Sequence, residues 1–513
     1  MPAVLSSNDA QTTLQPSMGR GASGPSSILA LTLLHHPDLG RVGARVLLPM
    51  FALGQEEALS RTQPALLGLD GSAHPLANPY VSRRPLRLVP GSKGGVTLLA
   101  ESLNYRVDGA PGTGCERLSP EDIERGVLLE LGGRVLLLLH RVHPGGPSKA
   151  DDLGLIGISD AMKELRGAVR RVGPLGGAVL VHGASGSGKE LVSRAIHQLS
   201  ARAKGPFVAV NLAAIPASTA ATELFGHARG AFTGAAERRR GYFEQAEGGT
   251  LLLDELGEAP LEIQPMLLRA LESGEIQPVG ASPRKVDVRV ICATDANLGA
   301  LVLAGRFRRP LLHRVEASRV DVPPLRDRRE DIALLFARLL EAEMAAVGAS
   351  ERLTQADPRE EPWLPTEVTA ALCQHAWPGN VRELQNVVRE LAVRCAGHDR
   401  ASLPERWTSP STPPPRSRPP ALPPSRIEPE QLRAALRRNR WRIGATARDL
   451  GIAKNSLYAL MESTPGVRRA KDVEEDEVRA ALAACGDDLR AAAERLEVSL
   501  PGLKARLRAL QDG

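Results

Sequence analysis

The stretch that decides the fold of this chain is VLVHGASGSGKE, residues 179–190. Its apolar start predicts a buried strand. The loop Gly183-Ala184-Ser185-Gly186-Ser187-Gly188 then leads through Lys189 into a helical segment. Such a loop points successive backbone N–H groups at a phosphate chain, while the lysine reaches the β and γ phosphates. The stretch therefore predicts a nucleotide-binding loop, although Glu190 stands where the general pattern has Ser or Thr to ligate magnesium.

A second motif, GGTLLLDEL, places two carboxylates at the end of another apolar strand. Ligands of α/β sheets bind at the carboxyl ends of the strands. Asp254 can hold magnesium directly or through water, and Glu255 can orient and deprotonate the water that attacks a γ-phosphate. The two motifs together predict hydrolysis of a nucleoside triphosphate with Mg²⁺.

Outward from these motifs, helical segments alternate with buried strands from residue 153 to about residue 397. AVLVHG, PFVAVNL, TLLLDE and VRVICAT are apolar runs without polar alternation. This pattern is typical of a parallel sheet covered by helices. The central region is therefore expected to be an α/β domain.

The segment between the two motifs carries a family resemblance. GAFTGA, residues 230–235, resembles the loop that defines sigma-54-dependent transcriptional activators of the AAA+ class. The resemblance spans residues 153–397, from LIGISDAM through VPPLRDRREDI to WPGNVRELQNVV. It implies an α/β subdomain over 153–325 and a helical lid over 326–397. Glu is usual after the lysine in that family, so Glu190 fits the family pattern.

The resemblance implies an ATP-driven machine. Members form a ring, here expected to be a hexamer, in which ATP hydrolysis moves the loop against the sigma factor. The sigma-54 RNA polymerase holoenzyme is then converted from closed to open promoter complexes. The expected sigma-factor contacts are Gly230, Ala231, Phe232, Thr233, Gly234 and Ala235, with Phe232 and Thr233 at the tip.

Further site residues follow from the same resemblance. Asn211 matches the position that holds Glu255 inactive until nucleotide and partner are in place. Arg308 and Arg314 match the arginine fingers that reach the γ-phosphate of a neighbouring subunit, and Arg382 matches the arginine of the lid. Residues expected to bind ATP are Gly183, Ala184, Ser185, Gly186, Ser187, Gly188, Lys189, Glu190, Asp254, Thr294 and Arg382.

Two departures from the family pattern bear on the rate. Asp295 replaces an Asn, and a carboxylate cannot donate the hydrogen bond that an amide offers a phosphate. Thr294 is then the residue expected to sense nucleotide. Pro310 also alters the segment that carries the arginine fingers. We therefore predict weaker ATPase activity than in a consensus member.

The N-terminal part is expected to be a β domain. Residues 1–27 are rich in Ser, Gly, Gln and Thr and are predicted to be a disordered leader. Short apolar runs alternate with Gly and Pro turns over 28–142, which favours an all-β sandwich or barrel. It resembles a divergent forkhead-associated domain, with Ser82, Arg83 and Asn104 at phosphothreonine-binding positions. Gln55 and Pro85 replace an expected Arg and His, so a docking domain without a ligand stays open.

The C-terminal part is expected to be all-α. A proline-rich tether over 404–428 precedes two similar segments, 431–461 and 477–507, which share nine identical positions. The first, within 429–470, resembles a Fis-type helix-turn-helix. Its expected contacts with double-stranded DNA are Arg440, Arg442, Lys454, Asn455, Ser456 and Tyr458. The second, within 474–513, has Pro501 and Gly502 at recognition positions, and we favour a packing or pseudo-dimer role over DNA reading.

Charge and cysteine content set the remaining limits. The chain has 513 residues and a net charge of +6. Residues 426–470 hold ten Arg or Lys against four Asp or Glu, so the basicity lies in the first helical segment, as phosphate binding requires. Five scattered cysteines, no membrane-spanning apolar run and no secretory signal favour a cytoplasmic protein. The alternatives are a DNA-binding scaffold that does not hydrolyse ATP and a different AAA+ remodeller.

Overall fold

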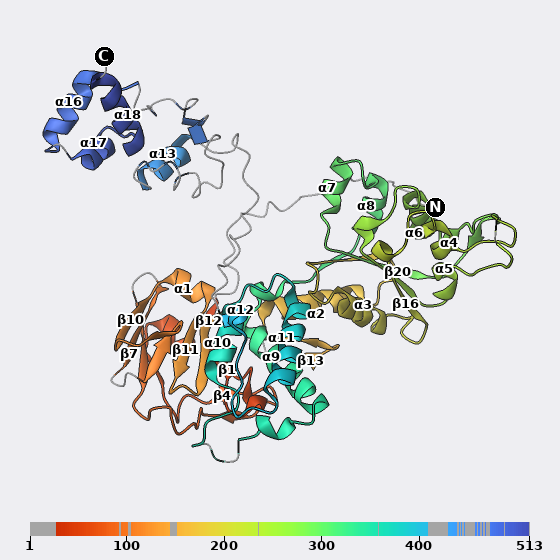
Figure 1. Ribbon diagram of the computed structural model, residues 1–513, viewed down its shortest axis with the longest axis horizontal. Coiled ribbons are helices and arrows are strands. Elements are labelled where there is room, and N and C mark those ends of the chain that lie inside the picture. Colours follow the sequence, from red (N-terminus) through yellow and green to blue (C-terminus); the bar gives the residue numbers. More distant parts are fainter. Residues whose placement is uncertain are drawn as a thin grey trace, which may run out of the picture. The chain divides into compact units, whose positions relative to one another are not determined.

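A computed structural model describes residues 27–91, 94–100, 104–143, 151–233, 235–355, 357, 359–408, 429–438, scattered positions between 441 and 467, 472–486 and 488–511. It divides into two compact units, Met1–Thr412 and Pro413–Gly513. The first unit contains a β domain, an α/β domain and a helical region (Figure 1).

The β domain consists of two antiparallel sheets around one core. The larger sheet has the strand order β5-β4-β2-β1-β12-β11-β8-β9 and the smaller one β10-β7-β6-β3. The strands are β1 (Ile28–His35), β2 (Arg45–Leu47), β3 (Glu57–Leu59), β4 (Leu66–Leu67), β5 (Ala73–His74), β6 (Leu86–Pro90), β7 (Val96–Ala100), β8 (Tyr105–Val107), β9 (Ala110–Pro111), β10 (Cys115–Leu118), β11 (Val127–Leu131) and β12 (Val135–Val142), with helix α1 (Pro120–Arg125) before β11. Leu88 and Leu98 of the smaller sheet meet Leu31 and Leu137 of the larger one in this core.

The α/β domain is built on a five-stranded parallel sheet of order β16-β17-β20-β15-β21. Its strands are β15 (Val179–His182), β16 (Phe207–Asn211), β17 (Thr250–Asp254), β20 (Arg289–Thr294) and β21 (Arg319–Asp321), and its helices are α2 (Asp160–Val172), α3 (Lys189–Gln198), α4 (Ala220–Phe225), α5 (Tyr242–Gln245), α6 (Gln264–Ser273), α7 (Leu298–Leu303) and α8 (Arg309–Val315). Leu251 and Leu253 pack on one face of the sheet while Leu252 packs on the other. Both faces are therefore covered, which explains the apolar runs.

The helical region follows the last strand and is called the lid below. It comprises α9 (Arg329–Ala346), α10 (Thr366–Gln374), α11 (Asn380–Cys395) and α12 (Glu405–Thr408). Phe336 and Trp377 are almost fully buried in its core, and the Trp377 indole N–H donates to the Leu372 carbonyl oxygen at 2.9 Å. The segment η6 (Leu325–Asp327) joins the lid to the α/β domain.

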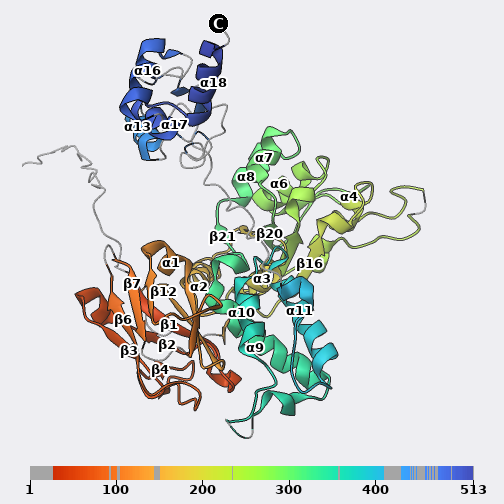
Figure 2. The same ribbon diagram turned by 60° about the vertical axis from the view of Figure 1, so that its left-hand side comes forward.

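The outer face of the larger β sheet packs directly on the lid. Helix α9 contacts β1, and helix α10 contacts both β1 and β12; the two views agree on this arrangement (Figures 1 and 2). The apolar residues of the two regions form one continuous cluster. From the β domain it includes Leu34, Val42, Leu128, Leu136 and Leu138, and from the lid Ile332, Leu335, Phe336, Trp363 and Val368. The β domain and the lid thus share a core.

Hydrogen bonds frame this shared core. The imidazole Nδ1 of His35 lies 2.9 Å from the Thr369 hydroxyl oxygen of α10. Arg329, at the start of α9, donates to the carbonyl oxygens of Arg125 and Gly126 at 2.8 and 2.9 Å. Both contacts join backbone or side chains far apart in sequence, so the lid is held to the β domain at several points.

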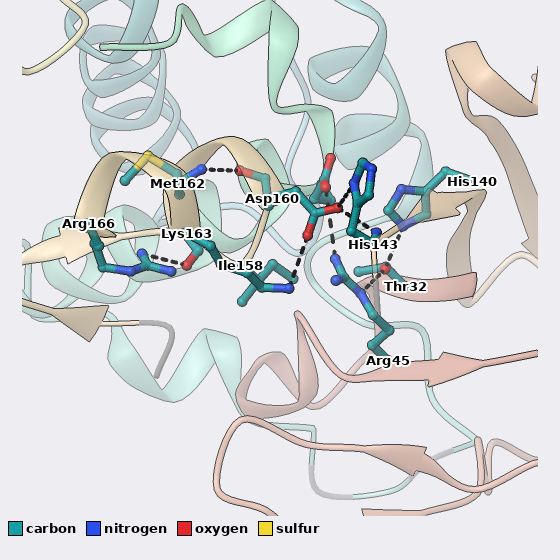
Figure 3. A network of polar contacts seen from close by, with 12 residues as sticks. Thr32, Arg45, His140, His143, Ile158, Asp160, Met162, Lys163 and Arg166 are labelled. Carbon is teal, nitrogen blue, oxygen red and sulfur yellow. Dashed lines mark hydrogen bonds and ion pairs between the residues drawn. The ribbon is translucent and has the colours of Figure 1, made fainter. Parts of the chain in front are cut away.

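A polar seam also links the β domain to the α/β domain (Figure 3). Asp160 accepts a hydrogen bond from the His143 backbone N–H at 2.7 Å. Arg45 donates to the Thr32 hydroxyl at 2.9 Å and lies 3.9 Å from the Glu330 carboxylate of the lid. Burial, and after it the neighbouring Asp331 carboxylate, raises the pKa of Glu330 to about 7. The seam therefore places a carboxyl that titrates near neutral pH between the parts of this unit.

The second unit contains helices α13 (Pro429–Arg438), α16 (Glu475–Ala484), α17 (Leu489–Arg495) and α18 (Leu500–Gln511). It has two small cores. One includes Leu432, Leu436, Trp441, Leu457 and Met461, and the other Val478, Ala492, Val498 and Leu503. Each similar segment of the sequence thus has its own core. No helix among the described residues is long and apolar enough to cross a membrane.

Candidate nucleotide site and partner loop

The glycine-rich loop lies between β15 and α3, at the carboxyl edge of the parallel sheet. Gly186 and Gly188 have φ angles of +72° and +105°, which glycine adopts without strain. Lys189 begins α3, its side chain is buried, and its Nζ donates to the Gly183 carbonyl oxygen at 3.1 Å. The same Nζ lies 3.8 Å from the Glu255 carboxylate. The loop therefore curls around the lysine, as the sequence motif predicts.

Ser187 shows that the loop fits a phosphate chain. Its hydroxyl oxygen is buried and makes no hydrogen bond in the described part of the chain. A buried hydroxyl without a partner is costly, so it calls for a polar ligand or water. The oxygens of a phosphate are suitable acceptors for it. ATP would therefore be held by Ser187, by the N–H groups of the loop and by Lys189.

Glu255 occupies a strained position directly after β17. Its φ angle of +54° lies in the left-handed region, which is uncommon for residues other than glycine and recurs at functional sites. Burial raises the pKa of Glu255, Lys189 lowers it, and the carboxylates of Asp295 and Asp254 raise it further. A carboxyl with a raised pKa beside the phosphate loop is suited to accept a proton from water.

Three more of the predicted site residues lie at the ends of neighbouring strands. Asp254 closes β17 and accepts a hydrogen bond from the Glu255 N–H at 3.0 Å. Asn211 pairs in register with Asp254, but its side chain caps the next turn by accepting from Ala213 N–H at 2.9 Å. Thr294 is buried at the end of β20, and its hydroxyl accepts from Ala296 N–H at 3.1 Å. The sheet brings these side chains to one edge.

Asp254, the predicted magnesium ligand, lies at this edge of the sheet. No group of three or more His, Cys, Asp or Glu side chains within the described ranges could hold a metal ion by itself. Mg²⁺ is usually bound by one or two carboxylates together with phosphate oxygens and water. Asp254 would hold Mg²⁺ in this way when a nucleotide is bound, and the ion would neutralise phosphate charge.

The predicted basic residues lie at different distances from the loop. Arg382 of α11 donates to the Ser185 hydroxyl at 3.4 Å, so the lid reaches the phosphate loop. Arg314 is exposed on α8 and donates twice to the Leu271 carbonyl oxygen, and Arg308 is exposed at the start of the same helix. Glu190 points to solvent and pairs with Arg194 at 2.8 Å. Arg308 and Arg314 therefore both lie at the surface of this domain.

The loop GAFTGA extends from a firm base. His227 and Arg239 pair their backbones, and Ala228 N–H donates to the Val279 carbonyl oxygen at 2.9 Å. Gly230 N–H donates to Ala235 O at 2.8 Å, which closes the loop on itself. Phe232 is 49% exposed and Thr233 is exposed, whereas Gly234 lies outside the described residues. A large exposed aromatic side chain at a loop tip is available to a partner.

One buried carboxylate holds the base of this loop. The Glu244 side chain is 1% exposed and pairs with Arg238 at 2.8 Å, Arg240 at 3.4 Å and Arg284 at 2.6 Å. Arg238 and Arg240 come from the segment that follows the loop, and Arg284 comes from the neighbouring hairpin of β18 (Glu275–Ile276) and β19 (Arg284–Lys285). Sequence reasoning missed Glu244, although the run of arginines before it required an acidic partner.

The candidate phosphopeptide residues are only partly assembled. Ser82 and Asn104 both line a cavity of about 30 Å³ on the β domain, together with Pro85. The Ser82 hydroxyl accepts from Arg84 N–H at 3.0 Å. Arg83 is exposed and does not line this cavity, and Gln55 is exposed as well. The cavity is too small to enclose a phosphate, so a peptide would contact it from outside.

The predicted DNA contacts fall mostly outside the described residues. Arg440, Arg442, Lys454, Asn455 and Ser456 are not described. Tyr458 is 44% exposed, while its neighbour Leu457 is fully buried in the core of the segment. The side chain of Tyr458 is therefore accessible, as a contact residue must be.

The fold and the site together define a P-loop ATPase domain of the AAA+ class. The family described as "Sigma-54 interaction domain" matches residues 155–321, and the family described as "AAA+ ATPase lid domain" matches residues 326–415. The transcriptional regulatory protein ZraR of Klebsiella oxytoca is 40% identical over 320 residues, which cover 62% of this chain and 70% of that protein. The chain belongs to the family of sigma-54-dependent transcriptional activators.

Other relatives match the central region. The DNA-binding transcriptional regulator NtrC of Escherichia coli K12 is 47% identical over 246 residues, or 48% of this chain and 50% of that protein. The chain thus spans about half the length of the NtrC relatives that it matches. The solved structure of NtrX from Brucella abortus in complex with ATP is 36% identical, with a TM-score of 0.44, and covers 61% of this chain and 69% of that one.

Proposed function

We propose that this protein is an ATP-dependent transcriptional activator. In a ring assembly, expected to be a hexamer, it hydrolyses ATP and remodels the closed complex of the sigma-54 RNA polymerase holoenzyme. A C-terminal segment binds upstream double-stranded DNA at the same time.

One observation carries this proposal: the phosphate loop and the loop of residues 230–235, called the partner loop, both connect to strands of the same parallel sheet. Asp254 and Glu255 end β17, and the 230–235 loop is inserted between β16 and β17. Glu255 directly follows β17, so a change in its contact with the γ-phosphate would be transmitted to that strand. The exposed Phe232 and Thr233 would transmit the resulting movement to the sigma factor. Arg308 and Arg314 would complete the site of the adjoining subunit.

The test is formation of heparin-resistant open complexes by the sigma-54 holoenzyme in the presence of ATP. We expect Thr233→Ala to reduce open complexes at least tenfold and to keep its ATPase rate, because it changes only the partner contact. Lys189→Ala should lose both activities. Ser218→Ala, an exposed hydroxyl outside the loop, is the matched control and should behave like the unaltered protein.

Each other outcome favours a different function. ATPase activity without open complexes from the unaltered protein would favour another AAA+ remodeller. Nucleotide binding without hydrolysis would favour the scaffold alternative, which Asp295 supports. Wild-type open-complex formation by Thr233→Ala would remove the loop from the mechanism.

The β domain is proposed as the sensor of this activator. Its contact with the lid supports a regulatory role, because Arg329 and Thr369 join lid helices directly to β-domain atoms. A phosphothreonine peptide is the proposed ligand, supported by Ser82 and Asn104 around one cavity. Titration with a phosphothreonine peptide library and its unphosphorylated counterpart tests this. Equal binding of both would leave the β domain as a docking module.

The C-terminal unit is proposed to bind DNA through its first segment. The excess of basic residues over 426–470 supports phosphate contacts there. The second segment, α16 to α18, is proposed to stabilise or pair this unit. Removing residues 474–513 should therefore leave the affinity for operator DNA within about twofold. A loss of tenfold or more in a salt-controlled binding assay would assign DNA contacts to the second segment.

A further inference from the structure

Asn380 occupies the point where the lid meets the phosphate loop. It is the first residue of α11, it is 1% exposed, and its φ angle is +54°. Asn is among the few residue types other than glycine that adopt this conformation readily. The backbone at this point thus favours Asn or Gly, and the side chain must explain why Asn is present.

Both halves of the Asn380 amide form hydrogen bonds with backbone groups. Its Nδ2 donates to the Ser185 carbonyl oxygen at 2.9 Å. Its Oδ1 accepts from the Leu325 N–H at 2.9 Å. A carbonyl can only accept and an N–H can only donate, so these partners fix the orientation of the amide. One buried side chain therefore joins the phosphate loop, the segment η6 and the lid.

The backbone around Asn380 contacts the next carbonyl of the loop. The N–H groups of Val381 and Arg382 lie 3.0 and 3.3 Å from the Gly186 carbonyl oxygen. A Cβ atom at Gly186 would come within 2.3 Å of the Gly379 oxygen, so the two segments are in direct contact. The first turn of α11 thus binds two successive carbonyl oxygens of the phosphate loop.

Binding these carbonyls determines where the N–H groups of the loop point. In a planar trans peptide, the carbonyl and the following N–H point in opposite directions. When the Ser185 carbonyl is held toward the lid, the Gly186 N–H is turned away from the lid and into the loop. Phosphate loops bind their ligand through N–H groups oriented in this way.

We propose that Asn380 is a positioning residue for nucleotide. It orients the peptide between Ser185 and Gly186 for phosphate binding, and it connects this peptide to Leu325 in the segment η6. The lid then responds to the phosphate through Asn380 as well as through Arg382. This inference rests on the proposed function, in that the bound ligand is a nucleotide of the ATPase cycle.

The variant Asn380→Asp tests this with one atom changed. The carboxylate still accepts from Leu325 N–H, but it cannot donate to Ser185 and faces that carbonyl oxygen with negative charge. Asn297→Asp is the matched control, because the Asn297 side chain accepts from Ala300 N–H at 3.0 Å, a contact that a carboxylate can also make. Asn380→Gly keeps the φ angle and removes both hydrogen bonds without adding charge.

The measurements use the full chain. We expect Asn380→Asp to weaken binding of a fluorescent ADP analogue and to raise KM for ATP, each about tenfold or more. Asn380→Gly should show a smaller effect of the same sign, and Asn297→Asp should match the unaltered protein. The defect of Asn380→Asp should shrink between about pH 8 and about pH 5, because a protonated carboxyl can donate again.

The contrary results are equally defined. If the role of Asn380 were purely structural, its variants would have a lower melting temperature in the absence of nucleotide and a smaller fraction of active protein. Their KM for ATP and their affinity for ADP would be unchanged, and that result would overturn the inference. If Asn380→Asp does not fold, the same criterion applies to Asn380→Gly. If the unaltered protein binds ADP but does not hydrolyse ATP, the proposed hydrolysis fails, while the ADP titrations still decide the role of Asn380.

Discussion

The shared core predicts that one substitution in the β domain destabilises the lid. Leu138 and Leu137 are neighbours on β12, and they are 1% and 0% exposed. Leu138 belongs to the cluster shared with the lid, whereas Leu137 belongs to the core between the two β sheets. Successive residues of a strand point to opposite faces, so this pair separates the two cores with the same side chain.

The size of the effect follows from the burial. Replacing a fully buried Leu by Ala costs about 2–5 kcal/mol, because apolar burial is lost and a cavity remains. We expect about 3 kcal/mol for both Leu138→Ala and Leu137→Ala. For Leu138→Ala, α9 and α10 lose a packing partner, and local opening of the lid should become about a hundredfold more frequent.

Hydrogen exchange followed by mass spectrometry measures this directly. Leu138→Ala should accelerate exchange in peptides of α9 and α10 as well as in β12. Leu137→Ala should accelerate exchange in β6 and β7 and leave the lid near its original rates. The reasoning would be refuted by a Leu138→Ala protein whose lid exchanges as slowly as before, or by equal lid effects from both substitutions.

Three further predictions concern charged groups. Asp295→Asn should raise the ATPase rate several-fold, because an amide can donate a hydrogen bond to a phosphate and a carboxylate cannot. It should also move the acid limb of the pH profile to lower pH, because burial and then the Asp295 carboxylate hold the pKa of Glu255 high; an unchanged profile in steady-state assays would contradict this. Glu330 has a folded-state pKa above its unfolded value, so its stabilising contribution is present at low pH and is lost as the pH rises through about 7. Glu330→Gln should therefore flatten the dependence of melting temperature on pH between about pH 5 and pH 8. A curve parallel to that of the unaltered protein would exclude Glu330 as a source of this pH dependence. Glu244→Gln leaves three arginines without their buried partner and should speed tryptic cleavage at the base of the partner loop about tenfold, with ATPase activity retained; unchanged cleavage would show that the carboxylate does not hold the loop.

Local patterns in the sequence were sufficient to indicate which elements meet at the carboxyl edge of the parallel sheet. The phosphate loop and the strand ending in Asp254 are each contiguous motifs, and parallel pairing brings their ends to one edge of the sheet. The sequence pattern GNVREL indicated Arg382, which reaches the phosphate loop. It did not indicate Asn380, because that role depends on a positive φ angle and on two backbone partners remote in sequence.

The packing between regions distant in the sequence was harder to predict from the sequence. The run VLLLLH in β12 lacks polar alternation, a signal that both faces of the strand are buried. The sequence could not indicate which region covers the second face, since any apolar helix satisfies the same pattern. Asn211 was expected to contact Glu255, and in this structure it caps the following turn, so that role stays a prediction.

The two buried faces of β12 also bear on how such proteins can be recombined. A strand with one face in solvent tolerates many residues on that face, whereas each position of β12 from Val135 to Leu139 must suit either the opposite sheet or the core shared with the lid helices. Exchanging the β domain for an unrelated domain would expose the apolar surface formed by Ile332, Leu335 and Phe336. A working chimera would need its lid surface redesigned to fit the new domain, so the β domain and the lid of this protein have to change together.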